Sequence, residues 1–474
     1  MNAREPAPRY EKPMTEAPDH RWRDILAGGR LPAFALVCLG SWLHAADALV
    51  TATIMPSVGA DLGGYAYFGW AIAGFYTGCI LAGATAGRLA ELLGVRIATV
   101  AAGLIYGAGC VLSAWAPTIE LFLAGRLIQG LGGGWISGFG YVVIGAVFPE
   151  RHLVKVLAAL AAVWGGATFI GPLVGGLFAE AGFWRGAFWA FGAQAIVFSA
   201  AAAVLLNKAG KQANAPGVPA LQTAVLTGAV GALAAAGLMK TLAAAAAAGA
   251  LGVVLLLVAL RIDARARVQL LPRRAGDLST AVGQGYAALF LLPAAGVVLS
   301  VYGPAVLQAV RGLSPLEAGY VVAAEALAWT AAAMAASKAG RRLGDRFIAL
   351  GGLCILIGVI GQSWALVHAP MAVIIALIAV QGVGFGLSWG FISARILGDL
   401  ADDERAIGSS ALGAVFQAGC AAGAALAGAA ANLSGFAGGP EGGAAARAGF
   451  WVFAAATPLA LGGAWAAWRL SRRL

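Results

Sequence analysis

The sequence predicts an all-α integral membrane protein whose chain crosses the bilayer fourteen times. Of its 474 residues, 61% are hydrophobic and only 11% are charged. A water-soluble domain carries roughly 25% charged residues because its surface must face water. The 69 glycines, many of them inside apolar runs, suit membrane helices, where small residues allow close backbone contact. Lipid is therefore the expected solvent for most of the surface.

The apolar runs give the helices in order. Residues 1–30 are polar and rich in proline, and we expect a disordered cytoplasmic tail there. A helix needs about 20 apolar residues to cross roughly 30 Å of hydrocarbon. The division of 221–260, an alanine-rich pair around Lys240, is the least distinct. The predicted spans are 33–56, 68–87, 97–115, 119–141, 153–180, 186–207, 221–239, 241–260, 281–309, 317–337, 347–367, 371–394, 406–433 and 447–468.

The distribution of charge predicts the orientation. With fourteen spans and both termini in the cytoplasm, outer loops hold only Arg185, Lys240, Arg311 and Arg447, and the other loop cations lie inside. This asymmetry follows the positive-inside rule and predicts a multi-pass protein of the cell inner (plasma) membrane. The net charge of +10 is spread between apolar runs, so it does not indicate nucleic-acid binding. The five cysteines show no CxxC spacing, and no metal site is expected.

A short repeat divides the chain into two halves. Leu93-Gly94-Val95-Arg96 and Leu343-Gly344-Asp345-Arg346 each follow the second helix of a six-helix set. Repeated halves are one transporter architecture, with the substrate site at mid-membrane between them. The predicted domains are an N-terminal six-helix bundle at 31–207, a linker with two extra transmembrane helices at 208–278, and a C-terminal six-helix bundle at 279–470.

Four motifs in the first half resemble those of the major facilitator superfamily, and within it the fourteen-span drug:proton antiporters. They comprise an acid in span 1, a loop motif after span 2, an Arg-x-x-Gln-Gly motif in span 4 and a Gly-Pro-x-x-Gly-Gly motif in span 5. The matching residues are Asp47; Gly87, Glu91, Gly94 and Arg96; Arg126, Gln129 and Gly130; and Gly171, Pro172, Gly175 and Gly176.

The resemblance implies the major facilitator fold, two six-helix bundles joined by two linker helices, and transport by alternating access. It associates the Gly171-Pro172 motif with antiport, although a proline kink needed only for packing is an alternative. It also implies that Glu91 caps a helix of the other half, near Asp402–Arg405, whereas a solvated turn is the simpler alternative. Glu91 replaces the family's usual aspartate, and Leu92 and Val95 stand where basic residues are common.

The residues themselves indicate where protons bind. An ionisable side chain deep in a bilayer is a functional candidate by default, and the deep ones here are Asp47, Arg126 and Glu325. At 1.5 Å per residue, Asp47 and Arg126 lie roughly 10–14 Å below the outer surface, with Glu325 at a similar level. We expect these three side chains to share one layer facing the cavity between the halves.

Within that layer we expect Asp47 to bind the proton and Arg126 to tune or compete for it, since burial and a nearby cation act oppositely on a carboxyl group. A permanently ionised pair that only fixes helix packing is the alternative. Glu325 is a second proton site, a contact for a cationic substrate, or a buried neutral acid. His44, three residues before Asp47, either relays protons, hydrogen-bonds Asp47, or packs.

Aromatic side chains in the spans are candidates for binding an amphiphile. Trp329 follows Glu325 by one helical turn and lies on its face, and Tyr76 and Trp389 are further candidates. Lipid contact or packing is the alternative for each of them.

The predicted function is proton-coupled export of lipophilic or cationic small molecules, of the multidrug-efflux type. The alternatives are a dedicated exporter of one native metabolite or lipid and, more distantly, a membrane receptor or enzyme. No nucleophile motif or phosphate-binding loop favours an enzyme. We expect no cofactor besides the proton gradient, membrane lipids and small molecules as partners, and a monomer.

Overall fold

The computed structural model describes residues 29–206, 219–239, 241–337, 339–401 and 404–472. Within these ranges the chain is helical, with two short 3₁₀ turns, η1 (Tyr65–Tyr67) and η2 (Phe436–Gly438). The α-helices are α2 (Leu31–Leu62), α3 (Phe68–Leu93), α4 (Val95–Trp115), α5 (Ile119–Val147), α6 (Glu150–Glu180), α7 (Arg185–Leu205), α8 (Ala220–Ala236), α9 (Leu242–Asp263), α10 (Ala281–Arg311), α11 (Pro315–Ala336), α12 (Arg341–His368), α13 (Met371–Gly398), α14 (Arg405–Leu433) and α15 (Ala444–Ser471).

Each predicted span corresponds to one of these helices, which confirms the all-α membrane class. Thirteen described helices are long and apolar enough to cross a membrane, and α8, with 17 residues, is shorter. The predicted tail lies outside the described residues except for its last two positions, and Lys240 also lies outside them.

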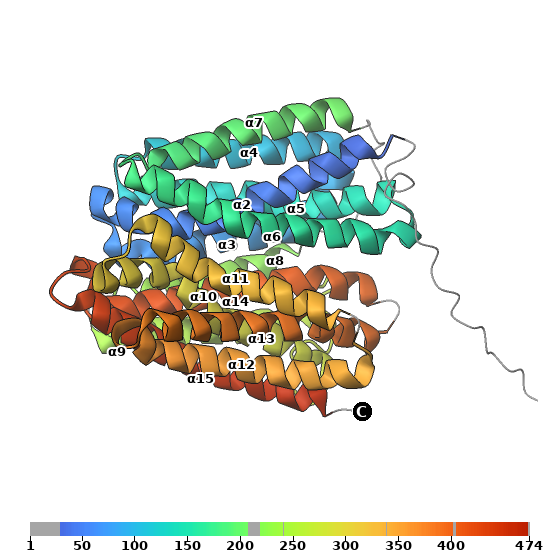
Figure 1. The fold of residues 1–474 in the computed structure, drawn as a ribbon. Coiled ribbons are helices and arrows are strands. Elements are labelled where there is room, and N and C mark those ends of the chain that lie inside the picture. Colours follow the sequence, from blue (N-terminus) through green and yellow to red (C-terminus); the bar gives the residue numbers. More distant parts are fainter. Residues whose placement is uncertain (1–28, 207–218, 240, 338, 402–403, 473–474) are drawn as a thin grey trace, which may run out of the picture.

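The helices form two bundles that lie side by side, as Figure 1 shows. Helices α2–α7 form one bundle and α10–α15 the other, and each is held by close packing of its second, third and fourth helices. The bundles meet along α3–α14 and α6–α11. The inserted helix α8 packs against α14 and α3, whereas α9 packs mainly against α8. The hairpin α8–α9 therefore covers one of the two seams between the halves.

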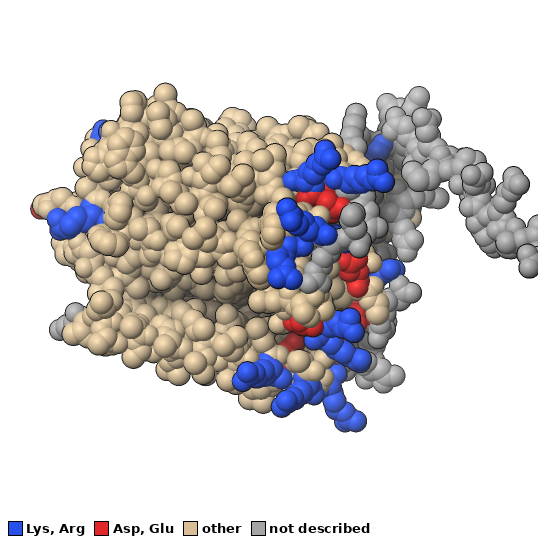
Figure 2. All heavy atoms as spheres, turned by 90° about the horizontal axis from the view of Figure 1, so that it is seen from below, with Lys and Arg blue, Asp and Glu red and all other residues tan. Residues whose placement is uncertain are grey.

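Charged side chains gather at one end of the molecule (Figure 2). We call this the basic end; the described chain begins and ends there, and the other end is called the distal end. The middle of the molecule shows almost no charged atoms on the face in view, as a lipid-facing surface requires. Cations of the basic end include Arg88, Arg96, Arg261, Arg273, Arg274, Arg346, Arg469 and Arg472.

The backbone contacts contain an internal repeat. A Cβ atom on Gly130 of α5 would lie 2.0 Å from the carbonyl oxygen of Phe75 in α3. A Cβ on Gly382 of α13 would meet the carbonyl oxygen of Glu325 in α11 at the same 2.0 Å. One turn further on, Gly134 and Gly386 repeat the pattern against Cys79 and Trp329. Close helix contact thus matches Phe75 with Glu325 and Gln129 with Gln381.

The Leu-Gly-x-Arg sequences occupy the same offset between the halves but differ in local structure. Gly94 separates α3 from α4 and has a φ of 79°, which favours glycine. Gly344 instead lies in the first turn of α12, where its α-carbon faces the ring of Phe391. The two copies therefore lie at matching positions of the two bundles, but only the first copy forms a loop between helices.

Candidate functional site

The N-terminal bundle contains a buried ion pair between α2 and α5. Asp47 and Arg126 have no exposed surface, and Nη1 of Arg126 lies 3.0 Å from both carboxylate oxygens. Gln129, also fully buried, joins the two: its amide donates to Asp47 at 2.8 Å and its oxygen accepts from Arg126 at 2.6 Å. The sequence predicts that Asp47 and Arg126 lie in one layer, and the structure brings these two side chains into contact.

Further groups surround the guanidinium of Arg126. Its Nε donates to the backbone oxygen of Ala71 at 3.5 Å, and the ring of Phe75 lies 4.6 Å from its central carbon. The hydroxyl of Thr51 donates to Asp47 at 3.4 Å. The Nη2 atom of Arg126 is buried and has no hydrogen-bond partner among the described residues. The cluster therefore compensates most, but not all, of the buried polarity.

His44 packs rather than bonding to Asp47. Its ring lies 5.5 Å from that of Phe75 and 5.7 Å from that of Trp164 of α6, measured between centroids. Its Nδ1 is buried with no hydrogen-bond partner in the described part of the chain. The described contacts of His44 are therefore with aromatic rings, and its role in proton relay or in packing stays a prediction.

Glu325 does not join the Asp47–Arg126 pair but belongs to a second polar cluster inside the C-terminal bundle. The amide of Gln381 donates to its carboxylate at 2.7 Å, and Gln362 donates to Gln381 at 2.9 Å. Gln362 and Gln381 are fully buried, whereas Glu325 is partly exposed. Sequence reasoning missed both glutamines, although Gln381-Gly382 repeats the Gln129-Gly130 dipeptide of the first half.

An aromatic group adjoins Glu325 on the side of the basic end. Trp329 stacks on Phe385 at 4.9 Å and lies 6.4 Å from Trp389, whose ring contacts Phe416 of α14 at 4.9 Å. Trp329, Trp389 and Phe416 are each partly exposed. The structure thus brings together two of the predicted substrate contacts, Trp329 and Trp389, beside a carboxyl group.

Tyr76 lies apart from these aromatics, at the seam between the halves. It packs on a cluster formed by Ile80 of α3, Val230 of α8 and Ala418 of α14. Its hydroxyl lies beside the thiol of Cys420. Tyr76 therefore lies where α3, α8 and α14 meet, at the contact of the two halves with the inserted hairpin.

The Gly-Pro-x-x-Gly-Gly motif of α6 closes the α6–α11 seam near the distal end. A Cβ atom on Gly171 would lie 2.7 Å from Leu49 of α2. On the other face of α6, a Cβ on Gly176 would lie 2.7 Å from the Cα of Leu316, and Pro172 faces Gly319. The motif therefore lets α6 pack closely on α2 and, across the seam, on α11.

The α3–α14 seam is closed at the distal end by a junction that the sequence did not reveal. A Cβ on Gly69 would lie 2.4 Å from the oxygen of Ala424, and Gly237 of the linker approaches Gly428. The side-chain nitrogen of Asn432 donates to Ala66 at 2.8 Å and to Gly237 at 2.7 Å. One amide thus joins both halves and the inserted hairpin.

Toward the basic end the same seam is more open. Gly83 and Gly87 of α3 and Gly413 of α14 are exposed, and no neighbouring side chain or element lies within 4 Å of their Cβ positions. Glu91, at the end of α3, has a buried Oε2 with no hydrogen-bond partner among the described residues. Among the described residues α14 has no side-chain cap at its start. Asp402 and Asp403 lie outside these residues, so the implied cap by Glu91 stays a prediction.

Two repeated six-helix bundles, closed at one end around buried ionisable groups, define a membrane transporter of the two-bundle class. The chain belongs to the major facilitator superfamily, whose family model matches residues 37–424. The family consists of transporters and not enzymes, which confirms the prediction that this protein is not an enzyme.

Relatives in sequence and structure agree with this family. A Mycobacterium tuberculosis protein named "Probable multidrug-efflux transporter Rv1634" is 29% identical over 436 residues, covering 87% of this chain and 90% of that protein. The vacuolar basic amino acid transporter 5 of Saccharomyces cerevisiae is 28% identical over 158 residues, covering 32% of this chain and 27% of its own.

Solved transporter structures share the fold. A structure of the nucleoside transporter NupG has a TM-score of 0.65 at 12% identity, covering 94% of this chain and all of that one. A D-xylose–proton symporter has a TM-score of 0.60 at 16% identity, covering 91% and 96%. At these identities the likeness concerns the fold alone.

Proposed function

We propose that this protein exports lipophilic or cationic small molecules in exchange for protons, with its basic end in the cytoplasm of the cell that carries it. The observation that carries the proposal is the fully buried Asp47–Arg126 pair. Holding a charge at this depth costs several kcal/mol unless it is paired or hydrated. A proton on Asp47 removes the negative partner of Arg126, so proton binding changes what holds α2 against α5.

The position of α2 links this event to the distal seam. Val50 and Thr53 follow Asp47 by about one and two turns and lie against Gly175 of the α6 motif. Across the seam, Thr53 also approaches Gly319 of α11. A shift of α2 on protonation therefore acts on the contact between the halves. This is the coupling that alternating access requires, because only differential contacts can shift a conformational equilibrium.

The proposed substrate class follows from the second cluster. A partly exposed carboxyl group beside Trp329 and Trp389 suits a lipophilic cation, since carboxylates and aromatic faces both attract cations. The similarity to a protein named as a multidrug-efflux transporter supports this class. The orientation rests on the concentration of arginine at the basic end, which the positive-inside rule places in the cytoplasm.

Transport in liposomes with an imposed pH gradient tests the proposal. We expect Asp47→Asn to reduce gradient-driven movement of a lipophilic cation to the level of empty liposomes, while the protein stays folded. Asp61→Asn is the matched control, because Asp61 lies on the same helix but is exposed and pairs with Arg185 at the distal end. Folded Asp47→Asn protein that retains gradient-driven transport would show that this acid does not couple protons.

A further inference from the structure

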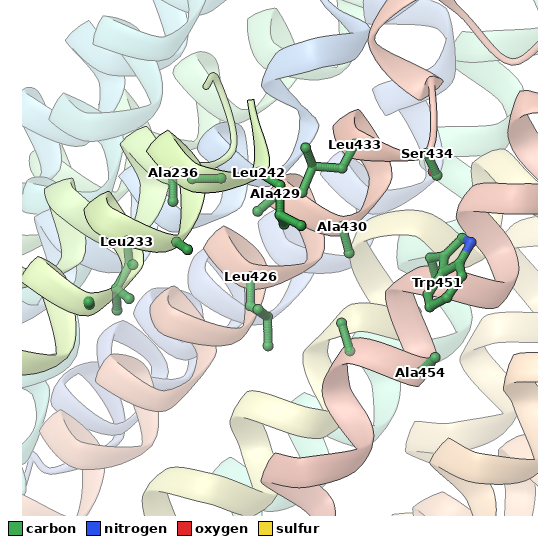
Figure 3. A pocket seen from close by; sticks show the side chains of 15 residues that line it. Leu233, Ala236, Leu242, Leu426, Ala429, Ala430, Leu433, Ser434, Trp451 and Ala454 are labelled. Atoms are coloured by element: carbon green, nitrogen blue, oxygen red, sulfur yellow. The ribbon is translucent and has the colours of Figure 1, made fainter. Parts of the chain in front are cut away.

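An apolar groove lies between the inserted hairpin and the C-terminal bundle, away from both polar clusters. Figure 3 shows its lining: Leu233, Ala236 and Leu242 on one side, Trp451 and Ala454 on the other, and α14 as the floor. Its volume is about 560 Å³, within the range of sites that hold one small ligand. The four helices contribute their distal segments, so the groove lies in the bilayer leaflet at the distal end.

The surroundings of the groove define what can fill it. Helix α9 packs mainly on α8, and its outward residues Leu251, Val254 and Leu257 are more than half exposed. The groove therefore opens onto the lipid-facing surface of a membrane protein. Its lining is alanine, leucine, glycine and one tryptophan, except for Ser434, whose hydroxyl donates to the backbone oxygen of Ala431 at 2.7 Å. An unbranched acyl chain matches such a lining.

A cation stands at the distal rim of this groove. Arg447 precedes Trp451 by one turn of α15, and its Nε donates to the backbone oxygen of Ser434 at 3.1 Å. Nη1 donates to Gly442 at 3.3 Å. The side chain is exposed and forms no ion pair within the described residues. Guanidinium groups bind phosphate through charge-assisted hydrogen bonds, so the rim is complementary to an anionic headgroup.

We propose that this groove binds one phospholipid of the distal leaflet, with an acyl chain between α9 and α15 and its phosphate at Arg447. The acyl chain and the phosphate can be bound together because Arg447 is hydrogen-bonded to Ser434, a lining residue that directly follows α14. Trp451, beside both, has the amphipathic ring that membrane proteins place at the headgroup level. The lipid fills the space that the loosely packed α9 leaves open.

Native mass spectrometry of the purified full chain tests the site. The delipidated protein is titrated with phosphatidylglycerol, or with a galactosyl diacylglycerol carrying the same acyl chains and no phosphate. We expect one phosphatidylglycerol to be retained at concentrations where the galactolipid is not. Arg447→Gln should weaken phosphatidylglycerol retention roughly tenfold or more, and Arg447→Lys should restore most of it.

A second pair of variants tests the groove itself. Gly249→Phe places a ring in the groove from α9, where no neighbouring side chain or element lies within 4 Å of the Cβ position, and should abolish retention. Gly231→Phe is the matched control, an equally open position on α8 outside the lining, and should retain the lipid. If Gly249→Phe retains phosphatidylglycerol as well as the unchanged protein does, the lipid binds elsewhere on the surface and the proposed site is wrong. Loss of tetraphenylphosphonium binding in Gly249→Phe with lipid retained would assign the groove to the substrate instead and also overturn it.

Discussion

Matched glutamines in the two bundles bind acids whose surroundings differ in charge and in exposure. In each bundle a glutamine precedes the glycine that makes the tightest contact with the second helix. Gln129 donates to Asp47, and Gln381 donates to Glu325. The first acid has no exposed surface and a guanidinium at 3.0 Å, whereas the second is partly exposed.

The difference has a local cause in the sequence. Glu325 occupies the position that matches Phe75, whose ring supports Arg126 in the N-terminal bundle. Counting three residues back from the matched glutamines, Ile378 stands where the first half has Arg126. The N-terminal bundle thus supplies its own counter-charge. Among the described residues of the C-terminal bundle, the hydrogen-bond donor to Glu325 is the amide of Gln381. A negative charge there therefore needs a partner from outside, either a proton or a cationic substrate.

The largest expected effect comes from removing the counter-charge of the first bundle. Arg126→Leu leaves Asp47 buried without its cation, and breaking such a pair costs about 3–5 kcal/mol of unfolding free energy. Arg126→Leu combined with Asp47→Asn should recover much of this loss, because the uncompensated charge is gone. Denaturation in mixed micelles gives the free energies of unfolding.

Arg185→Leu provides the control for this experiment, because Arg185 pairs with Asp61 in the same bundle while both remain partly exposed. We expect a smaller loss there, as for surface pairs generally. If the double variant were no more stable than Arg126→Leu alone, the penalty would lie in packing around the arginine and not in the buried charge of Asp47.

How far the sequence predicts this region depends on the kind of contact. The membrane requires apolar segments of a certain length and places basic loops on one side. The number of helices and the depths of Asp47 and Arg126 can therefore be predicted from the sequence alone. Their direct contact agrees with the predicted layer. Glu325 was expected in the same layer but does not contact this pair, because depth along a helix does not encode the lateral separation of the two bundles.

The distal junction shows what local sequence does not contain. Asn432, Ala66 and Gly237 are far apart in the chain, and the amide of Asn432 links them by backbone oxygens that any residue carries. No residue type marks an acceptor of that kind. The role of Gln381, in contrast, could have been predicted from the sequence, because a Gln-Gly dipeptide occurs on the fourth helix of each bundle.

A transplant of the first bundle's arginine would test the matched register directly. Ile378 is fully buried, so Ile378→Arg alone costs stability, but the new guanidinium would face Glu325 across the α11–α13 contact. We expect Ile378→Arg to lower the free energy of unfolding by about 1–3 kcal/mol less when Glu325 is present than when it is replaced by glutamine, because neighbouring residues are energetically coupled.

A double-mutant cycle of unfolding free energies measures this coupling. Val359→Arg supplies the control, since Val359 of α12 is equally buried but not at the matched position. A coupling of zero for Ile378→Arg would show that the two bundles do not share this register at the level of side chains.

The smallest effect on the fold, and the sharpest on function, is expected from Glu325→Gln. A glutamine keeps an oxygen that can accept from Gln381, so the free energy of unfolding should change by less than about 1 kcal/mol. Transport of a lipophilic cation should fall relative to a neutral lipophile of similar size, because the attraction for positive charge is gone while Trp329 and Trp389 remain. Paired assays in liposomes under the same pH gradient give this ratio. Equal loss of both substrates would instead make Glu325 a proton site, and no loss of either would leave it a packing residue, so each role predicted for this acid has its own outcome.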